Sequence, residues 1–93
     1  MHNDNFNEAR QALLSDELSE TFLADGTGVL LNIEKNQVLS LNRTGAHIVR
    51  MLMNEELGYP DLVRRMSEEY QLDASQAKQD VDEFITDLIA LLH

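Results

Sequence analysis

The feature that most restricts the fold is a change of hydrophobic period within LSLNRTGAHIV, residues 39–49. Leu39 and Leu41 alternate with Ser40, which is the period of a strand with one buried face. From Ala46 onward the apolar residues recur at helical spacing instead. Hardly any loop separates the two patterns, so the chain must join a strand directly to a helix.

Short apolar segments separated by turn residues precede this junction, and helical patterns follow it. The expected strands are 20–23, 29–33 and 37–41, and the expected helices are 44–54, 61–70 and 73–92. Asn42 or Thr44, Pro60, and Asp73 followed by Gln76 are typical of helix starts. The order βββααα predicts an α+β fold with a winged-helix-like arrangement, in which a three-stranded antiparallel sheet is followed by three helices.

The third expected helix has an unusually wide apolar arc, about 160° against the ~100° that a surface helix needs. The residues of one face are Ala77, Val81, Phe84, Leu88 and Leu91, and those of a flank beside Lys78 are Ile85, Ile89 and Leu92. Two interpretations stay open. The core surrounds this helix on two sides, or the flank belongs to a groove that receives a partner.

Residues 1–19 form an N-terminal arm, and residues 20–92 form the domain. Phe6, Ala9 and Leu13 have helical spacing within the arm. The arm is expected to be a flexible tail or a short helix. Alternatively, it covers a binding groove or exchanges with a second copy of the chain.

The charge and composition exclude several classes of function. The chain carries 17 acidic and 7 basic residues, a net charge of -10, and no cysteine. Nucleic acids and anionic membranes attract clustered Lys and Arg, so neither is an expected partner. No disulfide or thiolate site is available, and no signal peptide or membrane-spanning segment is recognisable. We therefore expect a cytoplasmic protein.

Catalytic constellations are missing from the sequence. His47 is isolated within a helix, and the neighbouring acidic pairs point in different directions on helical surfaces. The chain is therefore predicted to be no enzyme and to hold no metal or cofactor. The winged-helix outline leaves a DNA-binding regulator as the alternative, although the third helix would present Asp80, Asp82, Glu83 and Asp87 to the phosphates.

Three segments resemble the PqqD-like family, named after pyrroloquinoline quinone (PQQ) synthesis protein D. They are GVLLNIEKNQVLSLNRTGAHIVRML at 28–52, YPDLVRRMSEEYQLD at 59–73 and DVDEFITDLIALL at 80–92. The resemblance covers about residues 20–92. The segment at 53–56, MNEE, departs from the pattern of the quinone-pathway members, which leaves PQQ biosynthesis and another peptide-modification pathway both open.

The resemblance implies a peptide chaperone, also called a RiPP recognition element. Such a domain binds the leader segment of a ribosomally made precursor peptide and presents it to a modifying enzyme, often a radical SAM enzyme. The leader adds as a strand to the edge of the third strand, in a groove bordered by the third helix.

The predicted peptide-binding residues lie on these two elements. They are Gln37, Val38, Leu39, Ser40 and Leu41 of the strand, and Lys78, Val81, Asp82, Ile85 and Ile89 of the helix. Lys78 would suit an acidic residue of the leader. An open strand edge also favours association, so a homodimer formed by edge pairing is a further expectation.

Overall fold

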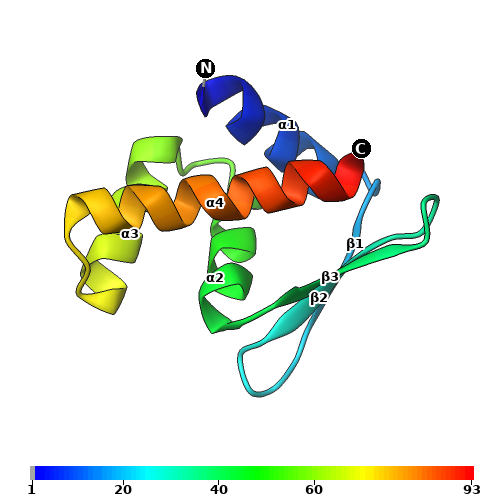
Figure 1. The fold of residues 1–93 in the computed structure, drawn as a ribbon, viewed down its shortest axis with the longest axis horizontal. Coiled ribbons are helices and arrows are strands. Elements are labelled where there is room, and N and C mark those ends of the chain that lie inside the picture. The colour runs from blue at the N-terminus through cyan, green and yellow to red at the C-terminus, as the bar shows by residue number, and fades with distance from the viewer. Residues whose placement is uncertain (1) are drawn as a thin grey trace.

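The computed structural model describes residues 2–93, with side chains described from residue 4 onward. The elements in chain order are α1 (His2–Leu14), β1 (Ser19–Phe22), β2 (Gly28–Asn32), β3 (Gln37–Leu41), α2 (Arg43–Leu52), α3 (Tyr59–Tyr70) and α4 (Ala74–Leu92) (Figure 1). The predicted α+β fold, a three-stranded antiparallel sheet followed by three helices, is confirmed. One further helix, α1, precedes the sheet.

The sheet has the order β1-β2-β3, and both pairings are antiparallel. β3 has the predicted bounds, whereas β1 and β2 each begin and end one residue before the expected positions. Leu30 pairs with Leu39 on the inner face, and Leu41 is buried beside them. Val38, on the opposite face, is 61% exposed. The alternation seen in the sequence therefore corresponds to an inner and an outer face.

The β1–β2 connection, residues 23–27, is a tight turn. The Asp25 carboxylate accepts hydrogen bonds from the hydroxyl and the backbone N–H of Thr27, at 2.6 and 3.0 Å. These two bonds lower the pKa of Asp25 below its ordinary value. Gly26 has a φ of 91°, a conformation that side chains with a Cβ rarely adopt.

Side-chain caps explain where α3 and α4 begin. The Asp73 carboxylate accepts from the backbone N–H of Gln76 at 2.8 Å, as its position in the sequence predicts. The backbone N–H of Gly58 donates to Asp61 at 2.9 Å, so α3 begins at Tyr59, two residues earlier than expected. Pro60 lies in the first turn of α3, where its missing N–H costs no hydrogen bond.

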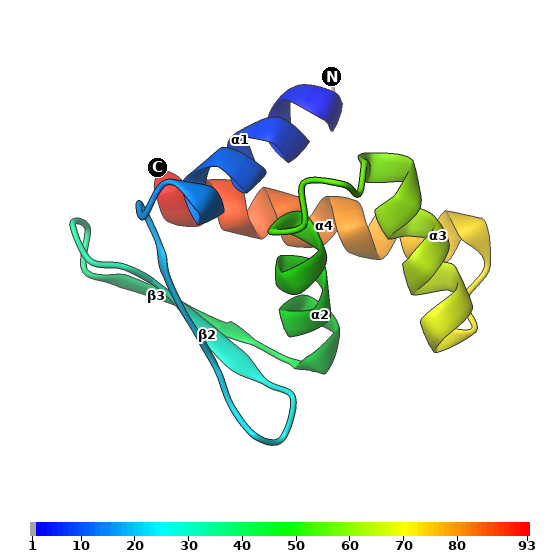
Figure 2. The same cartoon turned by 180° about the vertical axis from the view of Figure 1, so that it is seen from behind.

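α4 is the centre of the hydrophobic core. Its buried residues are Ala77, Val81, Ile85, Leu88 and Leu91. α1, α2, α3 and β3 all contact it. Figures 1 and 2 show α4 crossing the molecule, with α1 on one side and α2 and the sheet on the other. The wide apolar arc therefore fits a core that surrounds the helix on two sides.

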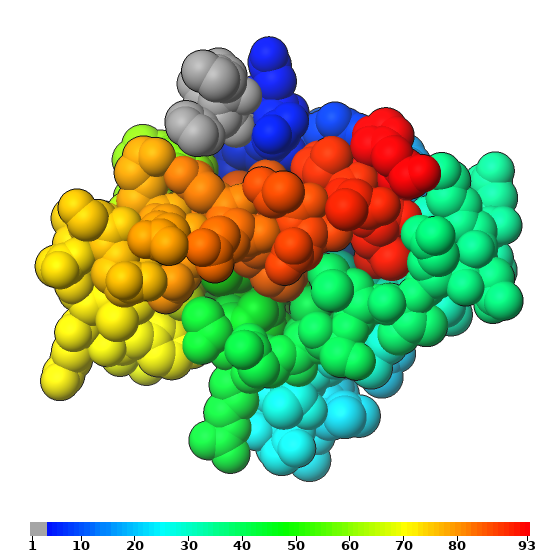
Figure 3. All heavy atoms as spheres, viewed as in Figure 1, coloured from blue at the N-terminus to red at the C-terminus, as the bar shows by residue number. Residues whose placement is uncertain are grey.

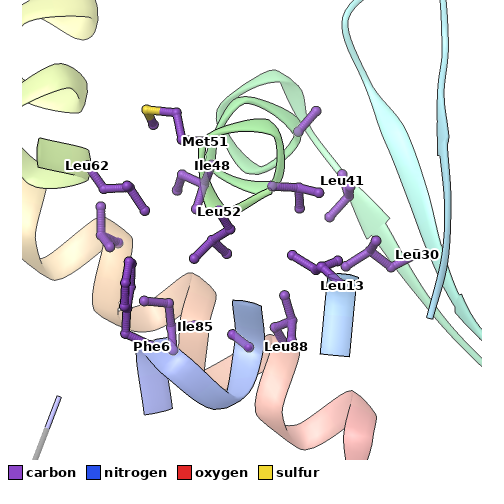
Figure 4. Close-up of a cluster of buried hydrophobic side chains, with 14 of the residues drawn as sticks. Phe6, Leu13, Leu30, Leu41, Ile48, Met51, Leu52, Leu62, Ile85 and Leu88 are labelled. Carbon is purple, nitrogen blue, oxygen red and sulfur yellow. The ribbon is translucent and has the colours of Figure 1, made fainter. Parts of the chain in front are cut away.

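α1 closes one of those sides. Its buried residues are Phe6, Ala9, Ala12 and Leu13. Figure 4 shows Phe6 and Ile85 pointing into the same cluster. The ring of Phe6 meets Tyr59 edge to face, with centroids 5.9 Å apart. Residues 2–14 thus form a helix that packs on the core of the domain. The division into an arm and a domain stays a prediction.

Arg10 ties α1 to the end of α2. Its guanidinium donates to the carbonyl oxygens of Leu52 and Leu57 at 2.6 and 2.5 Å. Leu52 is the last residue of α2, whose final carbonyls have no partner within the helix. Arg10 therefore donates hydrogen bonds to carbonyl groups at and after the end of α2, and these bonds hold α1 against that end.

Replacing Phe6 by Ala tests whether α1 is part of the cooperative fold. Phe6 is almost fully buried, so Phe6→Ala should lower the free energy of unfolding by about 3 kcal/mol or more. Gln11→Ala, at an exposed position of the same helix, should change it by less than ~0.5 kcal/mol. Urea unfolding followed by circular dichroism measures both. Equal midpoints for the two variants would contradict the packing described.

Candidate peptide-binding site

β3 is an outer strand of the sheet. It pairs with β2 only, so within the described residues one side of its backbone has no ladder partner. Unpaired N–H and C=O groups at such an edge are able to bind a further strand. Val38 and Ser40 are exposed along the edge, Leu39 is half-buried and Leu41 is buried. The condition on which the sequence prediction depended, that the third strand lies at the edge, is met.

A single residue, Asn42, connects β3 to α2. Its side-chain oxygen accepts a hydrogen bond from the backbone N–H of Gly45 at 2.8 Å, which makes it the N-cap of α2. The direct strand-to-helix connection of the sequence is therefore a capped helix start. Because no loop intervenes, the direction of β3 is fixed by the packing of α2.

Gly45 allows α2 and α4 to approach each other closely. A Cβ added at this position would lie 3.1 Å from the ring of Phe84 and 3.3 Å from the side-chain oxygen of Asn42. Both distances are shorter than ordinary contacts. Because residue 45 has no Cβ, the start of α2 and the end of β3 can lie beside α4.

Two neighbouring hollows follow the side of α4 that faces β3 and the start of α2. The first, of about 320 Å³, is lined by Gln37, Val38, Leu39, Asp87, Ala90 and Leu91. The second, of about 280 Å³, includes Asn42, Gly45, Asp80, Glu83, Phe84 and Asp87 in its lining. Asp87 lines both, so the two hollows are neighbours along α4, and we call them together the β3–α4 groove. Figure 3 shows β3 and the start of α2 directly against α4 on this face.

The α4 residues predicted from the sequence lie elsewhere. Val81 and Ile85 are in the core, with 0% and 4% of their surface exposed. Ile89 is half-buried and packs against the core. Lys78 and Asp82 form an ion pair at 2.9 Å. None of these five residues is among those that line the two hollows beside β3.

Lys78 and Asp82 lie on the opposite flank of α4, which faces α3 and α1. The hydroxyl of Tyr59 donates a hydrogen bond to the Asp82 carboxylate. Burial and this carboxylate raise the pKa of Tyr59 far above its ordinary value. Lys78 also lines an apolar hollow of about 430 Å³ between α3 and α4, together with Val63. A binding role for the predicted α4 residues stays a prediction.

The α4 residues that line the β3–α4 groove were not among the binding residues predicted from the sequence. They are Asp80, Glu83, Phe84, Asp87, Ala90 and Leu91. A helical wheel gives two flanks on either side of the apolar face, and it contains no information about which flank lies next to the sheet. The charge pattern of the helix would have indicated these residues only once the position of β3 was known.

Neither a metal-binding cluster nor a membrane-spanning helix is found among the described residues. Within the part of the chain that the structure describes, no three His, Asp or Glu side chains are close enough to hold a metal ion. His47 contacts the hydroxyl of Tyr70 at 3.2 Å, on α3. None of the helices within residues 2–93 has the length and apolar character that crossing a bilayer requires.

Comparison with known proteins gives one match. A family model described as coenzyme PQQ synthesis protein D (PqqD) matches residues 27–91. The match extends from the turn before β2 to the last turn of α4, and it includes the β3–α4 groove. No significant match is found among curated proteins or among solved structures.

Asn42 offers a test of the junction. Asn42→Ala removes the cap and should lower the free energy of unfolding by about 1 kcal/mol. Asn42→Asp keeps an accepting oxygen and places a negative charge at the positive end of the helix, so its stability should stay close to that of the unaltered protein. Urea unfolding of the three proteins measures the difference. If the Ala and Asp variants are equally stable, the hydrogen bond to Gly45 does not stabilise the junction.

Proposed function

The chain belongs to the PqqD family of coenzyme PQQ synthesis proteins, and on that premise we propose that it is a peptide chaperone. The family connects the protein with PQQ biosynthesis as a peptide-binding partner, and it is a non-catalytic accessory family. The resemblance noted in the sequence is therefore confirmed. The proposed peptide is the leader segment of a ribosomally made precursor, which binds as an added strand on β3.

The observation that carries this proposal is the open edge of β3 beside a groove, inside the matched region. Strand addition supplies main-chain hydrogen bonds, each of which contributes about 1 kcal/mol net. A five-residue edge offers few such bonds. Side chains of the peptide must therefore contribute as well, and the β3–α4 groove is where alternate side chains of the added strand would lie.

β1 is the other edge of the sheet, and it is a poorer candidate. It has four residues, against five in β3. The guanidinium of Arg50 lies over the ring of Phe22, 4.5 Å from its centroid, at the end of β1. Neither hollow of the β3–α4 groove is lined by a residue of β1. β3 combines an open edge with an adjacent groove.

The family resemblance also implies a partner enzyme. We infer that the bound peptide is presented to a modifying enzyme, and that this enzyme is a radical SAM enzyme. The chaperone itself needs no cofactor for strand addition. A cytoplasmic location and a homodimer formed by edge pairing stay predictions.

The alternative of a winged-helix DNA-binding protein has less support. The helix that would enter the groove of DNA is α4. Its exposed surface carries Asp87 and Glu83, and the charge of Lys78 is paired with Asp82. Phosphates would be repelled by this surface. The geometry therefore favours peptide binding.

Substituting Ser40 by Pro tests strand addition. Proline removes a backbone N–H and obstructs a ladder, so Ser40→Pro should weaken binding of a synthetic PQQ precursor peptide at least tenfold. Ser19→Pro is the matched control, because it makes the same change after a leucine in the opposite edge strand, and it should leave affinity unchanged. Isothermal titration calorimetry measures affinity, and circular dichroism checks the fold.

Amide exchange tests the same proposal without a substitution. Successive amides of a strand point to opposite sides, so either Val38 and Ser40 or Gln37, Leu39 and Leu41 should gain protection when peptide binds. Hydrogen exchange followed by NMR distinguishes the two sets. Unchanged protection along β3, or equal losses of affinity in both Pro variants, would contradict strand addition at this edge.

A further inference from the structure

We propose that the β3–α4 groove selects peptides with basic side chains, through Asp80, Glu83 and Asp87. This inference rests on the proposed function, because it concerns the peptide that is added to β3. It names a charge preference and the residues responsible for it. The expectation from the sequence had the opposite sign, since Lys78 suggested an acidic leader residue.

The lining of the groove carries charge of one sign. The side chains of Asp80, Glu83 and Asp87 line the hollow beside the start of α2, and Asp87 also lines the hollow beside β3. Neither hollow has a Lys or Arg among the lining residues found in the described part of the chain. Asp80, Glu83 and Asp87 occur at helical spacing, so the three carboxylates follow one side of the groove.

Within the described residues, none of these carboxylates takes part in an ion pair. Asp80 and Glu83 accept hydrogen bonds from Gln76 and Gln79, at 2.8 and 3.1 Å, and both donors are uncharged amides. Asp87 is exposed, and no ion pair involving it is found among the described residues. The negative potential of the groove is thus available to a ligand.

Three basic residues, Lys78, Lys35 and Arg43, contact groups outside the groove. Lys78 pairs with Asp82 on the other flank of α4. Lys35 donates to the backbone carbonyl of His93 at 2.8 Å, and Arg43 donates to that of Asp25 at 2.8 Å. Neither Lys35 nor Arg43 lines the groove.

Strand addition brings alternate side chains of the peptide toward α4. A Lys or Arg at those positions would meet Asp87 first and then Asp80 or Glu83, whereas Asp or Glu would be repelled. Partly exposed ion pairs are weak, so each pair should change the affinity by about two- to fivefold. Several pairs together would produce a clear preference, and added salt would reduce it.

Synthetic peptides of three compositions measure the preference. They share an alternating valine strand of nine residues and differ only at the intervening positions, which are all Lys, all Gln or all Glu. Each is made in both registers, so that one register presents the variable side chains to α4. Fluorescence anisotropy at low ionic strength should order the affinities Lys, then Gln, then Glu. High salt should bring the three values together.

Asp87→Asn identifies the source of the preference. It should reduce the ratio of Lys-peptide to Glu-peptide affinity by about two- to fivefold and leave the Gln-peptide affinity unchanged. Glu56→Gln is the control, because it changes the net charge equally from the exposed connection between α2 and α3. This control should change the ratio by much less.

The outcomes separate this inference from the proposed function. If the Gln peptide binds and Ser40→Pro abolishes its binding, strand addition stands. The charge preference is then overturned by equal affinities for the Lys and Glu peptides, or by equal effects of Asp87→Asn and Glu56→Gln. If Ser40→Pro leaves the affinity of the Gln peptide unchanged, strand addition itself is overturned, and the selectivity proposed for it falls as well. If none of these peptides binds while the precursor peptide binds and Ser40→Pro weakens that binding, the charge preference is overturned and strand addition stands.

Discussion

Burial of the apolar stripe on α4 is the interaction on which the rest of the structure depends. A chain of 93 residues has room for one small core, and α4 lies at its centre. Val81 and Leu88 are fully buried there. Each removes apolar area from water worth about 2 kcal/mol. α1, α2, α3 and β3 are held together because each of them covers part of this one helix.

Because β3 connects directly to α2, the packing of α2 on α4 also determines where the open edge of β3 lies. Asn42 caps the helix immediately after the strand, and Gly45 lets the start of α2 approach Phe84 on α4. The open edge of β3 is consequently positioned beside α4 by contacts of the core. A rigidly placed edge loses little conformational freedom when a peptide binds, which favours strand addition.

The two flanks of α4 have different surroundings. One is covered by α1 and α3, where Phe6 meets Tyr59 and Tyr59 donates to Asp82. The other borders β3 and carries the carboxylates of Asp80 and Asp87. One flank of α4 thus contributes to the stability of the fold, and the other is where we propose that the peptide is recognised. Substitutions on the first flank should change the stability of the fold, and those on the second flank should change the affinity for the proposed peptide.

Local sequence patterns were enough to predict the order and type of the elements after residue 18, a cap of α2 at Asn42 or Thr44, the Asp73 cap, and the alternation along β3. These features are local, since they depend on period, caps and turn residues within a few positions of the chain. Tertiary structure alone decided that α1 docks in the core and which flank of α4 faces the sheet. On a helical wheel, Ile85 and Asp87 both lie at the margins of the apolar face. In the structure Ile85 is buried, whereas Asp87 is exposed and lines the groove. That difference arises from contacts between segments far apart in the chain, which no local pattern contains.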